Sequence, residues 1–150
     1  MAETLGSLCD KLTIVKLKQW HSTDPERLKS LGSQEISLTD EINEFLADAV
    51  AGRIQEGRLK FESNKVYKKE GNEVAQIQGD FGAVFSQLAD VNCRLWHEQE
   101  KVYDFDKVPD SEKGVVVKQL AVLNLERTRC IEALDLNLCE HLARNNRLAQ

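Results

Sequence analysis

The chain has 150 residues, of which 41% are hydrophobic and 30% charged, a composition typical of one globular domain rather than of a disordered or membrane protein. Its formal net charge of −5 argues against nucleic-acid binding, because nucleic-acid-binding domains present a basic face. No apolar run approaches the roughly 18 residues that cross a bilayer, and the N-terminus lacks the basic start and apolar block of a signal peptide. We therefore expect a single cytoplasmic domain over residues 1–150, with neither nucleic acid nor membrane as a partner.

The first third of the chain predicts two long helices with a short helix between them. Residues 4–21 carry apolar side chains at helical spacing on two flanks, which is typical of a helix with neighbours on both sides. Residues 24–26 read Asp-Pro-Glu, an N-cap followed by a proline and an acid in the first turn. We expect the short helix that they begin to end at Gly32. A variant capping box then begins the second long helix, from Ser37 to about Ile54.

The rest of the chain predicts two further long helices. Glycines interrupt residues 57–79, and this segment favours either a short β-ribbon or an ordered loop. Apolar side chains recur at helical spacing over residues 80–103 and again from Asp110 to about Arg144. The sequence therefore predicts an all-α fold, an antiparallel bundle of about four helices with a loop or β-ribbon insertion around residues 57–79.

A short pattern occurs twice, in the first and third of the long helices. Residues 16–21 read Lys-Leu-Lys-Gln-Trp-His, and residues 92–97 read Asn-Cys-Arg-Leu-Trp-His. With residues 10–15 and the late Asn124-x-x-Arg127, these motifs resemble an uncharacterised bacterial family of all-helical proteins, a domain of unknown function. The resemblance implies a helical fold. Because members of that family often neighbour cell-surface glycan genes, it also implies a link to glycan metabolism.

Several polar residues fall where a helical bundle normally has apolar ones. Arg127 lies near the centre of the apolar face of the last helix, with Asn124 and Asp135 at its edge. Asn92 lies within the apolar face of the third helix, and Lys16 lies toward apolar neighbours on the first. Because burying an unpaired charge costs several kcal/mol, each of these residues needs a partner or a route to water.

Two interpretations of these residues remain open. In the structural one, Arg127 pairs with Asp135 or with Asp10, and the asparagines bond across the bundle. In the functional one, Arg127 holds a bound anion, since a guanidinium can bind phosphate or carboxylate through two parallel hydrogen bonds, and His97 is a candidate acid or base. The candidate ligand-binding residues are Lys16, Trp20, His21, Asn92, Trp96, His97, Asn124, Arg127 and Asp135.

Metal binding is a weaker alternative. Cys93, His97 and Glu100 project from one side of the third helix at i, i+4 and i+7, but the order His-x-x-Glu is the reverse of the usual di-metal motif. The four cysteines lack C-x-x-C spacing, which favours reduced thiols over a zinc site or disulfides. We predict no metal and no other cofactor.

Three functions follow from these observations, and whether the protein is an enzyme stays open. The first is a non-catalytic helical bundle that acts as a binding or accessory protein, as a homo-oligomer or with a protein partner. The second is a core site, binding or catalytic, for a phosphorylated or sugar-nucleotide ligand, an anionic small molecule. The third is a metal-binding bundle.

Overall fold

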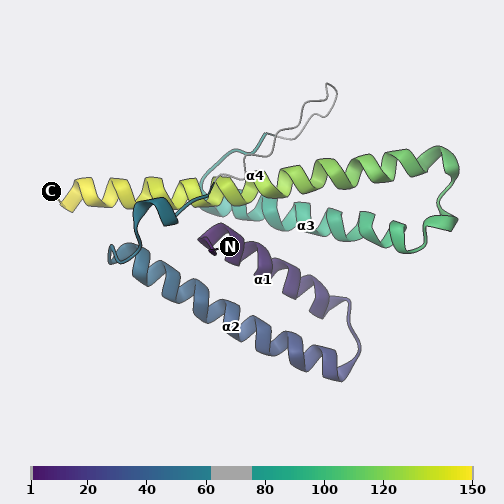
Figure 1. Ribbon diagram of the computed structural model, residues 1–150, viewed down its shortest axis with the longest axis horizontal. Helices are drawn as coiled ribbons and strands as arrows, with labels where there is room; N and C mark the ends of the chain where they lie inside the picture. The colour runs from purple at the N-terminus through teal and green to yellow at the C-terminus, as the bar shows by residue number, and fades with distance from the viewer. Residues whose placement is uncertain (1, 62–75, 150) are drawn as a thin grey trace.

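The computed structural model describes residues 2–61 and 76–149, and these residues form four α-helices (Figure 1). The helices are α1 (Leu5–Trp20), α2 (Pro25–Val50), α3 (Phe81–Tyr103) and α4 (Asp110–Ala149), with short 3-10 turns at Glu56–Arg58 and Phe105–Lys107. Consecutive helices run in opposite directions, and α1 packs against α2, α3 and α4, while α3 also packs against α4. The prediction of an all-α bundle of about four helices is confirmed.

The expected loop or β-ribbon at residues 57–79 is described only in part. Residues 56–58 form the first 3-10 turn, and no strand occurs within residues 2–61 and 76–149. Residues 62–75 lie outside the described residues, and the prediction for them therefore stays a prediction.

Side-chain hydrogen bonds to the first backbone N–H groups fix where α1 and α2 begin. Thr4 and Ser7 form a capping box at the start of α1, with each side chain bonded to the other's backbone N–H. Asp24 accepts a hydrogen bond from the backbone N–H of Glu26, 3.1 Å away, and Pro25 follows as the first residue of α2. These pairings are local, and the sequence predicts both starts within one residue.

The expected break between Gly32 and Ser37 is wrong, because α2 is one continuous helix of 26 residues. A glycine inside a helix costs only about 1 kcal/mol relative to alanine. The apolar side chains before and after Gly32 in the sequence follow the same helical period, and together they form the face of α2 that packs on α1. The helix ends at Val50 rather than near Ile54, and Gly52 follows with a φ of +73°, a conformation that glycine adopts without strain.

The helix α1 is the central element of the fold. It lies between α2 on one side and the hairpin of α3 and α4 on the other, whereas α2 packs mainly against α1 (Figure 1). With 40 residues, α4 is the longest helix, roughly 60 Å at 1.5 Å per residue. Among the described residues, no helix combines the length and the apolar character that a membrane span requires.

The hydrophobic core lies where α1, α3 and the C-terminal part of α4 meet. Its fully buried side chains include Leu5 of α1, Leu88 of α3, and Cys130 and Leu134 of α4. Burial raises the pKa of the Cys130 thiol to about 11, and therefore the group is neutral at pH 7. All four cysteines are free thiols.

Candidate functional site

A partly buried ion pair joins α1 and α4 at the centre of the bundle. The Asp10 side chain is 5% exposed, and both of its oxygens accept hydrogen bonds from Arg127. The Nε–Oδ1 distance is 2.8 Å and the Nη2–Oδ2 distance is 2.6 Å, the parallel geometry that suits a guanidinium and a carboxylate. The hydrogen bond to Asp10 raises the pKa of Arg127 above its ordinary value. Asp10 therefore neutralises the cation that the sequence places on the apolar face of α4.

Asn92 connects α3 to the same pair. Its Nδ2 donates to Asp10 Oδ1 at 2.9 Å and to Thr13 Oγ1 at 2.7 Å, and Thr13 in turn donates to the backbone carbonyl of Asp10. Asn92 is completely buried, and its Oδ1 is the one buried side-chain acceptor without a partner among the described residues. We call Asp10, Thr13, Asn92 and Arg127 the central polar network. It connects α1, α3 and α4. This agrees with the structural interpretation, in which Arg127 pairs with Asp10 and an asparagine bonds across the bundle.

Asp135 does not pair with Arg127. Its carboxylate accepts a hydrogen bond from the backbone N–H of Gly6 at 2.7 Å and is also bonded by the Thr4 side chain, at the N-terminal end of α1. Burial raises the pKa of Asp135 to about 6. Of the two pairings considered for Arg127, the one with Asp135 is wrong and the one with Asp10 is present.

The two Trp-His motifs have different environments. Trp96 stacks on His21, with 4.6 Å between the ring centroids and 22° between the planes, and its Nε1 donates to Glu100 at 3.0 Å. Trp20, by contrast, is 85% exposed, and His97 is also exposed. His21 of the first motif thus stacks on Trp96 of the second, whereas Trp20 and His97 are exposed to solvent.

The remaining candidate residues lie apart. Lys16 is exposed and pairs with Glu35 of α2, 2.6 Å away, and Asn124 is exposed and donates to the carbonyl of Leu120 in its own helix. The structure therefore does not bring the nine candidates together around one core cavity. It joins Asn92 and Arg127 through Asp10, stacks His21 on Trp96, and places Lys16 and Trp20 beside one groove. His97, Asn124 and Asp135 lie apart from these groups.

The weak metal alternative has no support in the described part of the chain. Within residues 2–61 and 76–149, no group of three His, Cys, Asp or Glu side chains could hold a metal ion, and Cys93, His97 and Glu100 are no exception. Glu100 instead accepts the hydrogen bond from the Trp96 indole.

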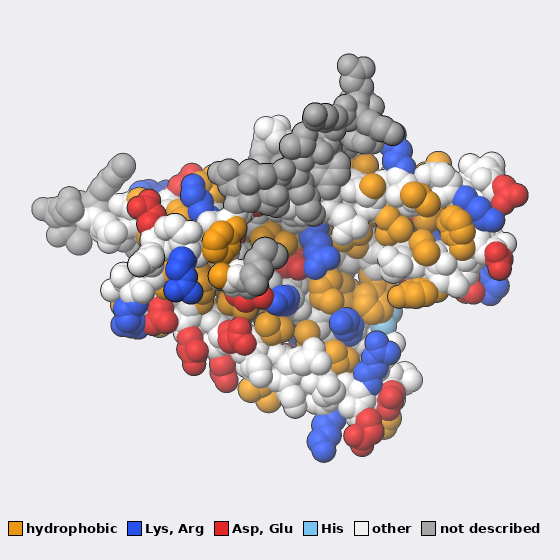
Figure 2. All heavy atoms as spheres, in the orientation of Figure 1, with side chains coloured by type: hydrophobic (Ala, Val, Ile, Leu, Met, Phe, Trp, Pro, Cys, Tyr) orange, Lys and Arg blue, Asp and Glu red, His pale blue; other side chains and the backbone are white. Residues whose placement is uncertain are grey.

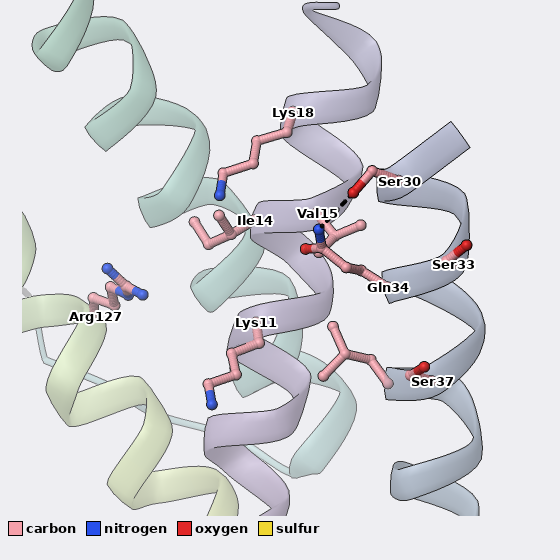
Figure 3. Close-up of a pocket in the computed structure, with 10 residues that line it drawn as sticks. Lys11, Ile14, Val15, Lys18, Ser30, Ser33, Gln34, Ser37 and Arg127 are labelled. Atoms are coloured by element: carbon pink, nitrogen blue, oxygen red, sulfur yellow. Dashed lines mark hydrogen bonds between the residues drawn. The ribbon is translucent and has the colours of Figure 1, made fainter. Parts of the chain in front are cut away.

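A concave surface lies on each side of α1. The α1–α3 groove, of about 660 Å³, is lined by Thr13, Lys16, Leu17, Gln19, Trp20, Ala89 and Cys93. The α1–α2 cleft, of about 510 Å³, is lined by residues of α1 and α2 together with Arg127 (Figure 3).

Sequence reasoning missed two lysines of the α1–α2 cleft, Lys11 and Lys18. The signal that could have found them is their spacing around Ile14, at i, i+3 and i+7, because this spacing puts all three residues on one face of a helix. The chain matches no model of a protein family, and comparison with curated proteins and with solved structures finds no match either.

Proposed function

We propose that this protein is a non-catalytic binding protein that acts as a dimer, in which α2 of one copy packs against α2 of a second copy. The observation that carries this proposal is a stripe of exposed residues along α2, beside the face that packs on α1. It comprises Ile36, Thr39, Asn43, Leu46 and Val50, and we call it the outer stripe.

The spacing of the outer stripe is that of a helix-pairing seam. Its members follow one another at intervals of three, four, three and four residues, the heptad spacing that keeps one face of a helix against a partner. Ile36 is 66% exposed, Leu46 37% and Val50 72%, so that three large apolar side chains of one face are in contact with solvent. Asn43 occupies the same heptad position as Ile36 and Val50. A polar residue at this position often sets the register of paired helices.

Charge is unevenly distributed along α2. All four charged residues in the C-terminal half of α2 are acidic, and red side chains gather there in Figure 2; they are Asp40, Glu41, Glu44 and Asp48. Both cations of the helix, Arg27 and Lys29, lie near its N-terminus. Pairing along the outer stripe, over residues 36–50, brings the acidic halves of the two helices together, and salt screens their repulsion.

The central polar network supports a non-catalytic role. Arg127, on which a core site would have depended, is engaged by Asp10, and the candidate base His97 lies apart in an exposed position. The expected link to cell-surface glycan metabolism, and membership of the family that implies it, stay predictions.

Light scattering during size-exclusion chromatography tests the dimer. We expect the wild type to have twice the 17.0 kDa mass of one chain, and Ile36→Glu to have the mass of a monomer, because the substitution places a charge inside the pairing surface. The matched control is Val115→Glu, which puts the same charge on an exposed valine of α4 (60% exposed) and should leave the dimer intact.

Three outcomes would contradict the proposal. The first is a monomeric wild type at about 100 μM, a concentration at which a specific dimer would be populated. The second is a dimer that survives Ile36→Glu. The third is a dimer that Val115→Glu dissociates as fully as Ile36→Glu does. Circular dichroism should show the same helix content in all three proteins, since both substituted side chains are exposed.

A further inference from the structure

The α1–α2 cleft has the size of a small-molecule site. Its volume of about 510 Å³ lies within the range of roughly 300–1,000 Å³ that is usual for such sites. Three helices contribute to its walls, because Arg127 of α4 joins the residues of α1 and α2 (Figure 3).

Cations gather at one side of this cleft. Lys11 and Lys18 are seven residues apart, which places them on the same face of α1 and two turns, or roughly 10 Å, from each other. Figure 3 shows that both ammonium groups extend to the side of α1 on which Arg127 lies, with Ile14 between them. A lysine stem has four flexible methylenes, and both ammonium groups can therefore reach a ligand group placed between them.

The neighbouring carboxylates do not neutralise all of this charge. Lys11 pairs with Glu3, and Arg127 uses Nε and Nη2 to bind Asp10. No described carboxylate lies within ion-pair distance of Lys18, and Nη1 of Arg127 has no partner among the described residues. Three cations thus face two carboxylates, and one positive charge is left in a chain whose net charge is −5.

The remaining surface of the cleft is mixed. Ile14, Val15 and Leu38 provide apolar contacts, and Ser30 and Gln34 of α2 provide neutral hydrogen-bonding groups. We propose that the α1–α2 cleft binds a small organic phosphate monoester, with the phosphate at Lys11, Lys18 and the Nη1 of Arg127 and the organic part against the apolar wall.

A phosphate monoester fits this arrangement better than a carboxylate. Its three terminal oxygens point in different directions and accept hydrogen bonds from donors on separate side chains, whereas a carboxylate presents two oxygens in one plane. The proposal does not depend on the pairing of α2, because the cleft residues and the outer stripe lie on different faces of that helix.

Isothermal titration calorimetry at constant ionic strength tests the site with three probes: phenyl phosphate, inorganic phosphate and benzoate. We expect phenyl phosphate to bind most tightly, inorganic phosphate more weakly because it lacks the apolar part, and benzoate least tightly. Lys18→Met should weaken phenyl phosphate binding by about tenfold or more, since it removes a charge-assisted hydrogen bond.

The matched control is Lys16→Met, which removes the same charge from the same helix but on the side of the α1–α3 groove. It should change phenyl phosphate binding by less than about twofold, as expected for an exposed charge outside the site. Arg127→Met is unsuitable, because it would leave Asp10 buried without its cation and destabilise the fold.

The proposal is overturned if phenyl phosphate does not bind the wild type at about 10 mM, a concentration at which even weak sites are occupied. It is equally overturned if Lys16→Met weakens binding as much as Lys18→Met does, or if benzoate binds as tightly as phenyl phosphate. The light-scattering result for the dimer affects none of these outcomes.

Discussion

Asp10 and Asp135 are both buried carboxylates, but they are stabilised in different ways. Asp10 faces the guanidinium of Arg127 and the side-chain amide of Asn92. Among the described residues, Asp135 receives a backbone N–H from Gly6 and the side-chain hydrogen bond from Thr4. These neutral donors do not offset the loss of hydration, and burial therefore raises the pKa of Asp135 to about 6.

Asp135 should make stability depend on pH in a defined direction. The unfolded chain releases this proton near pH 3.8 and the folded chain near pH 6, so that the folded state binds more protons between these values. Its stability therefore falls as pH rises through this window, by up to about 3 kcal/mol at 1.36 kcal/mol per pKa unit. Asp135→Asn keeps an oxygen acceptor for Gly6 and removes the titration.

Urea unfolding of the wild type and of Asp135→Asn between pH 4 and pH 7.5 measures this effect. The free energy of unfolding of the wild type minus that of the variant should decrease as pH rises to about 6 and be constant above about 7. A packing difference between the two proteins would shift this quantity equally at every pH. A difference that does not change with pH would show that Asp135 titrates normally.

At the scale of secondary-structure elements, α1 and α4 come into close backbone contact at Gly6. A Cβ atom built on Gly6 would lie 2.5 Å from the backbone oxygen of Ile131 and 2.9 Å from a carboxylate oxygen of Asp135. The glycine is required here by contact with a neighbouring backbone rather than by its own φ angle. The same contact brings the Gly6 N–H to Asp135, and it therefore sets how α1 sits on α4.

Two glycine-to-alanine substitutions should have effects of opposite sign. Gly6→Ala should destabilise the fold by about 2 kcal/mol or more, because the Ile131 backbone must move to make room. Gly32→Ala should stabilise it by up to about 1 kcal/mol, since a Cβ there meets nothing within 4 Å and alanine favours the helix. Urea unfolding of both variants provides the measurement. A Gly6→Ala protein as stable as the wild type would contradict the close approach.

At the scale of the whole molecule, the fold consists of two helical hairpins of unequal burial. The hairpin of α3 and α4 contains most of the buried core, whereas α2 has only Leu31 and Ala49 buried and packs mainly against α1. The loss of α2 from the bundle would therefore expose less apolar surface than the separation of α3 from α4.

Hydrogen exchange followed by mass spectrometry should show this difference. At low protein concentration, we expect the amides of α2 to exchange faster than those of α3 and of the middle of α4, because a partial opening that releases α2 costs less than global unfolding. If α2 pairs with a second copy, its protection should increase with protein concentration, while that of α3 should not. Equal protection of α2 and α3 at low concentration would mean that the four helices unfold as one unit.

Features that depend on neighbours in the chain were predictable. The sequence predicts α3 at residues 80–103, where the structure has Phe81–Tyr103, and it predicts the start of α4 at Asp110. Helical periodicity and capping residues are local properties, and for this reason they can be read without the fold. Where local signals competed at Gly32, the prediction failed, because the packing of α2 on α1 outweighs the small cost of a glycine.

The sequence by itself determined that the chain forms about four helices, and that Asn92 and Arg127 lie on faces turned toward other helices. Only the tertiary structure decided that Arg127 meets Asp10 rather than Asp135, and that Lys11 and Lys18 line a cleft with it. The physical reason is that spacing along the chain fixes the direction of a side chain around its own helix. Which residue it meets depends on how two helices are rotated and shifted against each other, and contacts between residues distant in sequence, such as Gly6 against Ile131, set that arrangement.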